Sequence, residues 1–320
     1  MDLEVYQRKQ KRRNTAIIIA FFMMLLLSVL ISMRSGYSSL SVTDILRVIL
    51  GGGSENEELV LFSFRLPRIV LSIMVGMGLA TAGCLLQAVT GNALADTGIL
   101  GINAGAGLMV VLYVIAFGTQ SASAIFTLPF AALLGASGAF LLIYLLIKKR
   151  DLGISPFSMV MTGIAVQAGL SALTTLMVIK LDDTQYAFVS SWQSGSIWGA
   201  NWTFVLAVLP WLCILLIAAM CKARVLDILG LREETAAGLG LRIKKEQQGI
   251  LLIAVGLAGA CVSVSGSISF VGLMAPHIAR RLVGPRHNTL MPVCALVGSV
   301  LVSVADTIAR VIIQPSSLPT

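Results

Sequence analysis

Long apolar stretches without a single charged residue recur along this chain, and they restrict its fold more than any other feature. They cover residues 14–33, 69–91, 97–147, 152–179, 184–221, 247–279 and 287–305. One transmembrane helix needs about 20 apolar residues, and the stretch 97–147 is long enough for two helices with a turn near residues 118–123. The chain is 57% hydrophobic and only 12% charged, too apolar for an ordinary soluble core. We therefore predict an all-α, polytopic membrane protein with about nine spans.

The placement of the basic residues predicts the topology. Most of the 23 Lys and Arg residues fall in four blocks, at residues 8–13, 148–150, 222–245 and 280–286. If the amino terminus is cytoplasmic and the spans alternate, all four blocks lie on the cytoplasmic side, as the positive-inside rule requires. The net charge of +8 is then a topology signal facing membrane lipid, and it does not indicate nucleic acid. We expect a single membrane domain over residues 1–320, located in the cell membrane.

One polar stretch, residues 222–248, interrupts the apolar pattern on the expected cytoplasmic side. It is helix-prone from Leu226 to Ala237 and is broken by Gly238 and Gly240. We predict two short helices that lie on the inner face. The stretch is too short for a catalytic domain and has the size of a docking surface.

Small residues follow one face of the second predicted span, residues 69–89. Gly76, Ala80, Gly83 and Gln87 recur at helical spacing. Small side chains let a neighbouring backbone approach closely, and the glutamine amide can bond across such an interface. The pattern is compatible with tight helix packing alone or with an additional role in transport.

The turn after this span is rich in glycine. Asn92 and Asp96 flank it, and Asp96 or Thr97 is placed to cap the next span. Gly98, Gly101 and the glycines that follow weaken a helix, so they must serve close approach, bending or movement. We interpret the turn as a flexible inner mouth.

Gly272 and Pro276 lie in an apolar run that is too short for a straight span between its neighbours. A helix broken at membrane depth persists only where protein or a water-filled cavity satisfies the freed backbone groups. We expect His277 to bond the backbone freed by Pro276, and its sequence neighbours give no metal site.

Arg65, Arg68 and Arg310 are isolated at the outer ends of two spans. They either anchor the helices by snorkelling to the membrane surface or bind an acidic partner.

Several functional classes lack their signatures. The chain has no G-x-x-x-x-G-K-[ST] phosphate loop, so it is not expected to hydrolyse ATP. The spans carry no central carboxylate or lysine of an ion-coupled carrier, and no clustered acid, base and nucleophile of a membrane enzyme. Energy for any transport must come from elsewhere.

Six ordered features, RLPR, the small-residue helix with Gln87, NALADTGILGINAGA, LREETAAGLGL, SFVGLMAPHIARR and ADTIAR, resemble the iron-siderophore and vitamin B12 (FecCD-type) permease family of ABC importers. The resemblance implies a type II ABC importer permease fold with about ten spans. It also implies a homodimer or close heterodimer with the substrate path between subunits, two cytoplasmic ATPase subunits that carry ATP and Mg, and an extracytoplasmic binding protein. No cofactor or metal is expected on this chain.

We expect roles for three groups of residues, the first two from the resemblance and the third from the sequence features described above. The binding protein would dock on Arg65, Arg68 and Arg310. The ATPase subunits would contact Glu233, Glu234, Ala237, Gly238, Leu239, Gly240 and Leu241. Translocation and gating would involve Gln87, Asn92, Asp96, Gly98, Gly101, Pro276 and His277.

The expected function is that of a permease subunit for ferric siderophore uptake, not of an enzyme. Cobalamin or haem import by the same machinery is the alternative, and an ion-coupled secondary transporter is a distant one. The chain departs from the family pattern at Ala93 and Thr97, where proline is usual. It also stops at LPT, where the family continues into a tenth span, so we expect a truncated chain or one that ends on the outer face.

Overall fold

The computed structural model describes residues 3–35, 42–98, 101–119, 122–148, 156–197, 199–231 and 233–312, and all regular structure in these ranges is helical. Residues 313–320, which include the terminal LPT, lie outside the described residues. The elements are α1 Leu3–Arg34, α2 Val42–Ile49, α3 Glu55–Glu58, the π-helix η1 Leu59–Arg65, α4 Leu66–Thr90, α5 Ile102–Phe117, α6 Ala122–Lys148, α7 Pro156–Val178, α8 Asp183–Gln193, α9 Trp202–Cys221, α10 Ala223–Leu229, α11 Glu233–Gly238, α12 Ile243–Ser265, α13 Val271–Val283 and α14 His287–Ile312.

The prediction of an all-α polytopic protein is confirmed. Seven helical segments of the described residues are long and apolar enough to cross a membrane, in α1, α3–α4, α6, α7, α9, α12 and α14. Two of the nine predicted spans are shorter. α5 has 16 residues and α13 has 13, so at about 1.5 Å per residue neither crosses the hydrocarbon layer as a straight helix.

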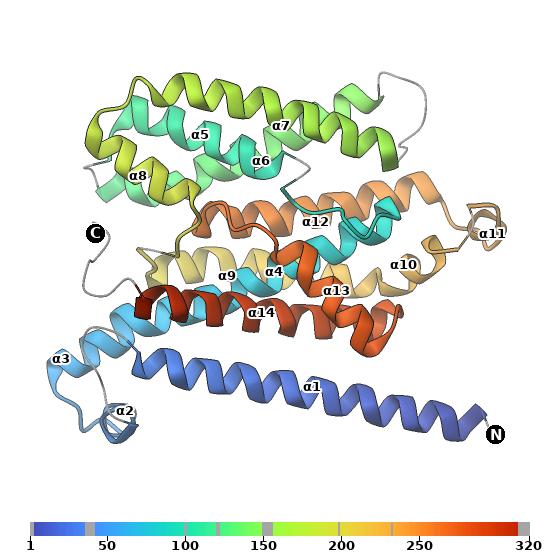
Figure 1. The fold of residues 1–320 in the computed structure, drawn as a ribbon, viewed down its shortest axis with the longest axis horizontal. Helices are drawn as coiled ribbons and strands as arrows, with labels where there is room; N and C mark the ends of the chain where they lie inside the picture. The colour runs from blue at the N-terminus through green and yellow to red at the C-terminus, as the bar shows by residue number, and fades with distance from the viewer. Residues whose placement is uncertain are drawn as a thin grey trace.

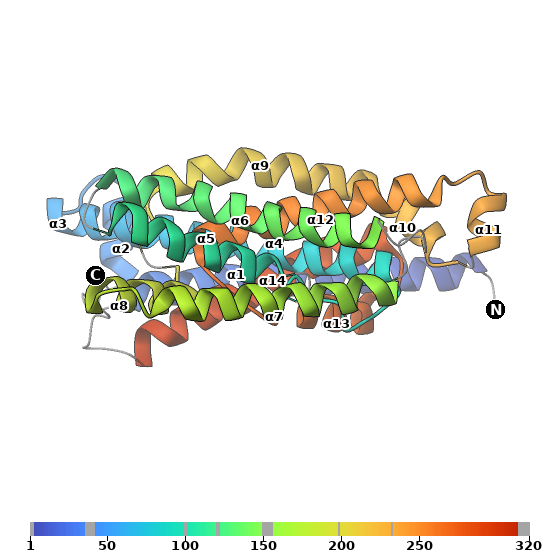
Figure 2. The ribbon, with the colours of Figure 1, turned by 90° about the horizontal axis from the view of Figure 1, so that it is seen from above.

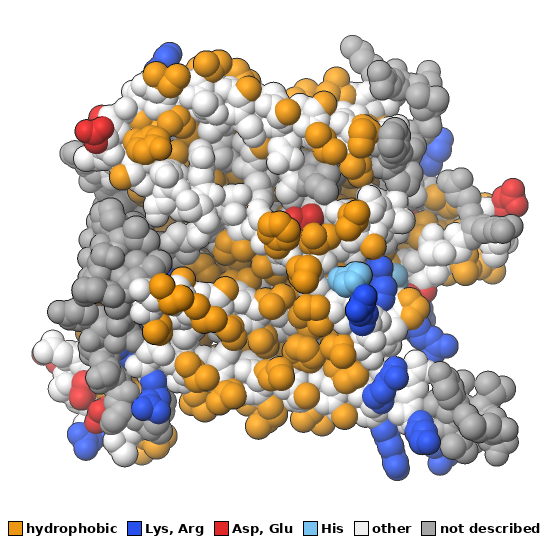
Figure 3. Space-filling view, viewed as in Figure 1, with side chains coloured by type: hydrophobic (Ala, Val, Ile, Leu, Met, Phe, Trp, Pro, Cys, Tyr) orange, Lys and Arg blue, Asp and Glu red, His pale blue; other side chains and the backbone are white. Residues whose placement is uncertain are grey.

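The long helices lie roughly along one axis, which gives the molecule two distinct ends (Figures 1 and 2). One end holds the amino terminus, α10 and α11, together with the basic residues 8–13 of α1 and Arg280 and Arg281 of α13; we call it the basic end. The other end holds α2 and α3, and we call it the far end. On one face, hydrophobic side chains cover the middle while Lys and Arg gather toward the ends (Figure 3).

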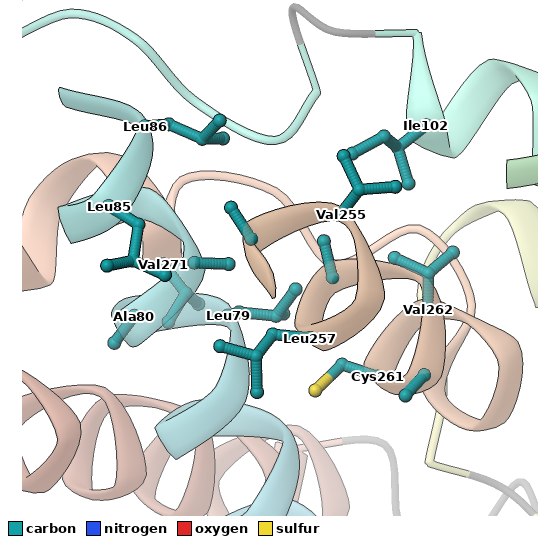
Figure 4. Close-up of a cluster of buried hydrophobic side chains, with 14 of the residues drawn as sticks. Leu79, Ala80, Leu85, Leu86, Ile102, Val255, Leu257, Cys261, Val262 and Val271 are labelled. Carbon is teal, nitrogen blue, oxygen red and sulfur yellow. The ribbon is translucent and has the colours of Figure 1, made fainter. Parts of the chain in front are cut away.

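The core forms around α4. In its most apolar window, 83% of the residues are buried, compared with 17% for α1 and 11% for α7. Leu79 and Leu85 of α4, Ile102 of α5, and Leu257 and Cys261 of α12 belong to one buried cluster, and all five are essentially inaccessible (Figure 4). α4 is therefore the central buried helix, whereas most of the surface of α1 and α7 faces outward.

The predicted broken helix is present, but the break lies earlier than Pro276. α12 ends at Ser265 and is followed by Gly266, which has a φ of 65°; α13 begins after Phe270, which has a φ of 67°. Pro276 lies buried inside α13, which turns back toward the basic end (Figure 1). We call residues 266–270 the helix break.

A second short helix supports this break. The segment after α8 brings the Ser196 backbone N–H to 2.9 Å from the carbonyl oxygen of Ser265. A Cβ at Gly266 would lie 2.1 Å from the carbonyl oxygen of Trp192, so α8 and the break are in close contact. Protein groups therefore satisfy backbone that lipid could not.

Candidate functional site

The small-residue face of α4 packs against two different helices. In its far-end half, Gly76 meets Gly298 of α14 so closely that a Cβ at Gly76 would lie 2.3 Å from the Gly298 carbonyl oxygen. The Cys294 thiol donates to the carbonyl oxygen of Ala80 at 3.2 Å. Side chains larger than glycine at this crossing would push the two backbones apart.

The other half of this face packs against α13. A Cβ at Gly83 would lie 1.9 Å from the carbonyl oxygen of Gly272. The Gln87 amide Nε2 donates to the carbonyl oxygens of Leu273 at 3.3 Å and Gly272 at 3.5 Å. The predicted close packing and the bond across the interface are thus confirmed. A role for Gln87 in gating stays a prediction.

The partner of Gln87 explains how α13 tolerates Pro276. Proline has no backbone N–H, so the carbonyl four residues earlier, that of Gly272, loses its helical donor. Gln87 supplies a donor to that oxygen, whereas the His277 side chain is exposed. Our expectation that His277 bonds the freed backbone is therefore wrong.

The predicted inner mouth is a non-helical loop, residues 91–98, which we call the mouth loop. Asn92 Oδ1 accepts the backbone N–H of Leu94 at 2.9 Å, and this turn leaves the Leu94 side chain 69% exposed. Gly98 lies near the Asp96 carboxylate. Short-range bonds within the loop therefore fix part of its conformation.

Asp96 and Thr97 do not cap the next helix. α5 begins only at Ile102, after Gly101 in the left-handed conformation with a φ of 66°, and no side chain caps it. Instead, the Asp96 carboxylate accepts backbone N–H bonds from Thr97, Gly98 and Phe270. Asp96 therefore joins the mouth loop to the helix break.

Burial raises the pKa of Asp96 above its usual value, and the surrounding N–H donors oppose this effect without cancelling it. Asp96 Oδ1 lies only 2.5 Å from the position that a Cβ on Gly272 would take. The mouth loop, the helix break and the Gln87 end of α4 thus meet at one junction. A displacement of one of these three segments would therefore alter its contacts with the other two.

The three outer arginines form one cluster with an acid that the sequence interpretation did not include. Asp306 Oδ1 lies 2.8 Å from Arg68 Nη2 and 2.9 Å from Arg68 Nε, and Asp306 Oδ2 lies 3.3 Å from Arg310 Nε. Arg310 also donates to Ser32 Oγ, and Arg65 donates to the carbonyl oxygen of Met33, so the cluster ties α1, α4 and α14 together. We call these four charged residues the far-end cluster.

The far-end cluster is largely enclosed. The side chain of Asp306 is 7% exposed, that of Arg310 13% and that of Arg68 26%, while residue Arg65 is 6% exposed. Arg68 and Arg310 share the Asp306 carboxylate, so within these four residues the arginines outnumber the acid. The pairing of Asp306 with Arg310 could have been predicted from their spacing of four residues in a helix. The pairing of Asp306 with Arg68 joins distant segments and could not.

The residues that we expect to contact the ATPase lie at the basic end (Figure 1). α10 and α11 are two short helices, and Leu241 follows them just before α12. Ala236 is buried, which anchors α11, while Leu239 is 63% exposed. Glu234, Ala237, Gly238 and Gly240 are also exposed. Glu233 is the first residue of α11. This end offers an accessible surface, and docking of an ATPase on it stays a prediction.

These features define a class. A bundle of membrane-length helices with a broken helix inside it and a short accessible segment at one end is the architecture of a membrane transport subunit. The model of the FecCD transport family matches residues 24–320, and the chain belongs to this family.

Relatives with functional names align along most of the chain. The iron(3+)-hydroxamate import system permease protein FhuG of Bacillus subtilis (strain 168) is 48% identical over 294 residues, covering 90% of this chain and 87% of FhuG. The iron-uptake system permease protein FeuC of the same organism is 39% identical, covering 90% and 87%. The Fe(3+) dicitrate transport system permease protein FecD of Escherichia coli (strain K12) is 36% identical, covering 81% and 79%.

A solved structure has the same fold. It is a metal-chelate type ABC transporter in an inward-facing conformation, 28% identical, with a TM-score of 0.81 over 93% of this chain and 91% of that chain. The expected type II importer permease fold is therefore confirmed.

Proposed function

We propose that this chain is the permease subunit of an ATP-driven importer for ferric siderophores. The observation that carries the proposal is the 48% identity to an iron(3+)-hydroxamate permease along 90% of the chain. Relatives named for ferric citrate and other iron-uptake systems support iron chelates over the alternative cargoes, cobalamin and haem.

The basic end faces the cytoplasm in this proposal, and two ATPase subunits dock there. The basic residues at this end follow the positive-inside rule. The exposed surface around Glu234 to Gly240 supplies the contact, and ATP and Mg are bound by those partner subunits. This chain itself binds no cofactor and performs no hydrolysis.

The substrate path lies between this chain and a second permease subunit, and α7 faces it. α7 is the least buried of the seven long apolar segments and has the lowest mean hydropathy, 1.5. Its outward surface carries the small residues Ala165, Ala168, Gly169 and Ala172, which permit close helix contact. If α7 faces a second subunit and a polar path as well as lipid, both its low burial within this chain and its low hydropathy are explained.

The junction of the mouth loop with the helix break closes the cytoplasmic side of this path. Gln87, Asn92, Asp96, Gly98, Gly101, Pro276 and His277 lie in or beside this region. The loop carries the exposed Leu94, and Asp96 holds it against Phe270. Movement of α13 would therefore shift the loop.

The far-end cluster presents positive charge to an extracytoplasmic binding protein. Because Asp306 holds Arg68 and Arg310, replacing these arginines by glutamate would place several carboxylates in one enclosed site and damage the fold. A charge-balanced variant, Arg68→Gln with Asp306→Asn, is the better test. It should raise several-fold the concentration of loaded binding protein that gives half-maximal uptake.

The matched control is Arg47→Gln with Asp44→Asn, which also removes one charge of each sign at the far end, on α2. It should leave this concentration unchanged. Equal responses of the two double variants would contradict docking through Arg68.

Cargo is tested by growth and uptake in a strain that lacks this gene. Restoration of the chain should restore accumulation of radioactive iron from hydroxamate siderophores under iron limitation. Restored uptake of cobalamin or haem without iron uptake would refute the siderophore proposal and favour the alternative.

A further inference from the structure

α14 runs between the two regions to which the proposed function assigns partner proteins (Figure 1). It contains 26 residues, about 39 Å at 1.5 Å per residue. Its far-end turns carry Asp306 and Arg310, and its first residue at the basic end is His287. One helix thus reaches both the far-end cluster and the cytoplasmic surface.

The first turn of α14 is capped by a residue of α10, which lies in the polar stretch 222–248; we call this stretch the coupling segment. Asp227 of α10 accepts the backbone N–H of His287 at 2.9 Å, and the same oxygen lies 2.7 Å from His287 Nδ1. Backbone N–H groups in the first turn of a helix have no partner within the helix, and a carboxylate there also interacts favourably with the helix dipole. Asp227 therefore does for α14 what an N-cap residue normally does from within the same helix.

The two partners of this contact differ in burial. The His287 side chain is 10% exposed and that of Asp227 is 35% exposed, while Leu226, next to Asp227, is completely buried. The neighbouring ion pair of Lys222 with Glu246, at 2.7 Å, joins the start of α10 to α12 and does not reach α14. Among the side-chain hydrogen bonds and ion pairs of the described residues, the contact of Asp227 with His287 is the one that links the coupling segment to α14.

The rest of α14 can pass on a displacement. Gly298 is in backbone contact with Gly76 of α4, and Ser299 Oγ donates to the carbonyl oxygen of Ile73 at 3.1 Å. Closely packed helices resist gradual deformation, so a displacement of the first turn of α14 would shift the helix as a rigid unit.

We propose that Asp227 is a positioning residue for energy coupling: it fixes α10 to the first turn of α14, so that ATPase-driven movement of the coupling segment displaces α14. The inference rests on the proposed function.

The test uses the complete transporter in proteoliposomes, with its ATPase subunits, its binding protein and a hydroxamate siderophore loaded with radioactive iron. Two quantities are measured for Asp227→Ala, Asp227→Asn and His287→Ala: ATP hydrolysis, and iron transported per ATP hydrolysed. Asp227→Ala should lower the transport ratio about fivefold or more while hydrolysis without binding protein stays near the wild-type rate. The double variant of Asp227→Ala with His287→Ala should be no worse than Asp227→Ala alone, because both remove one interaction.

The matched control is Asp182→Ala, which removes another capping carboxylate, that of α8, at a site remote from the basic end. It should keep the wild-type ratio. An unchanged ratio in Asp227→Ala, or multiplicative effects in the double variant, would overturn the inference. If both Asp227 variants fail to assemble with the ATPase subunits, the residue is a structural anchor and the inference is also wrong. If the wild-type complex transports no iron, the proposed function fails, which is a separate result.

Discussion

The contact between Gly83 and Gly272 allows a sharp prediction about the junction. In Gly83→Ala, the new methyl group would lie 1.9 Å from the Gly272 carbonyl oxygen and 2.5 Å from the Gly272 carbonyl carbon and Cα. These are backbone atoms, so they cannot rotate away as the end of a side chain could. Ordinary contact begins near 3.4 Å, so α13 must move by about 1.5 Å relative to α4.

Such a displacement affects the other bonds of the junction. The Gln87 donor, 3.3 Å from the Leu273 carbonyl oxygen, is already near the limit of a hydrogen bond and would be lost. Overpacking of this kind costs about 1–3 kcal/mol. We expect Gly83→Ala to lower the thermal denaturation temperature of the protein in nanodiscs by several degrees and to reduce iron uptake.

Gly138→Ala is the matched control. Gly138 lies in α6, and a Cβ there would meet nothing within 4 Å. Alanine is favoured over glycine inside a helix by up to about 1 kcal/mol, so this variant should be equal to or more stable than the wild type. If Gly83→Ala proves as stable as Gly138→Ala, the close packing of α4 against α13 is not as described.

Two further predictions concern buried charges. Burial raises the pKa of Asp96 in the folded protein, so the stability that this group contributes is fully present below the ordinary carboxyl pKa and is lost as pH rises through the raised value. Asp96→Asn should therefore flatten this part of the profile of unfolding free energy against pH, measured from acidic to neutral pH. An identical decline in the wild type and the variant would contradict this reasoning. Asp306→Asn leaves Arg68 and Arg310 enclosed without their counter-charge and should lower the free energy of unfolding by about 3 kcal/mol. Adding Arg68→Gln should recover part of this loss. Wild-type stability of the single variant would show that the pairing does not hold.

The sequence predicted features that depend on local periodicity. The repeat of Gly76, Ala80, Gly83 and Gln87 on one helical face reports directly on what that face can pack against. Long charge-free stretches likewise predicted the long helices, because length and apolarity alone decide whether a helix can span.

Features that depend on contacts between distant segments could not be predicted in the same way. Asp96 looked like a helix cap, but left-handed Gly101 delays the start of α5, and the carboxylate binds Phe270 instead. Pro276 looked like the break because proline removes a helical hydrogen bond. The Gln87 amide replaces that bond, and the chain breaks where Gly266 and Phe270 adopt positive φ.

The measurement that tests the central claim most directly is ATP-dependent accumulation of radioactive iron in proteoliposomes that contain this chain with its ATPase subunits. The cargo is a ferric hydroxamate siderophore delivered by the binding protein. The proposed function predicts accumulation that requires ATP, the binding protein and this chain, and that persists when ion gradients are abolished. Accumulation driven by a proton or sodium gradient without ATP, or no transport of any ferric siderophore, would contradict it.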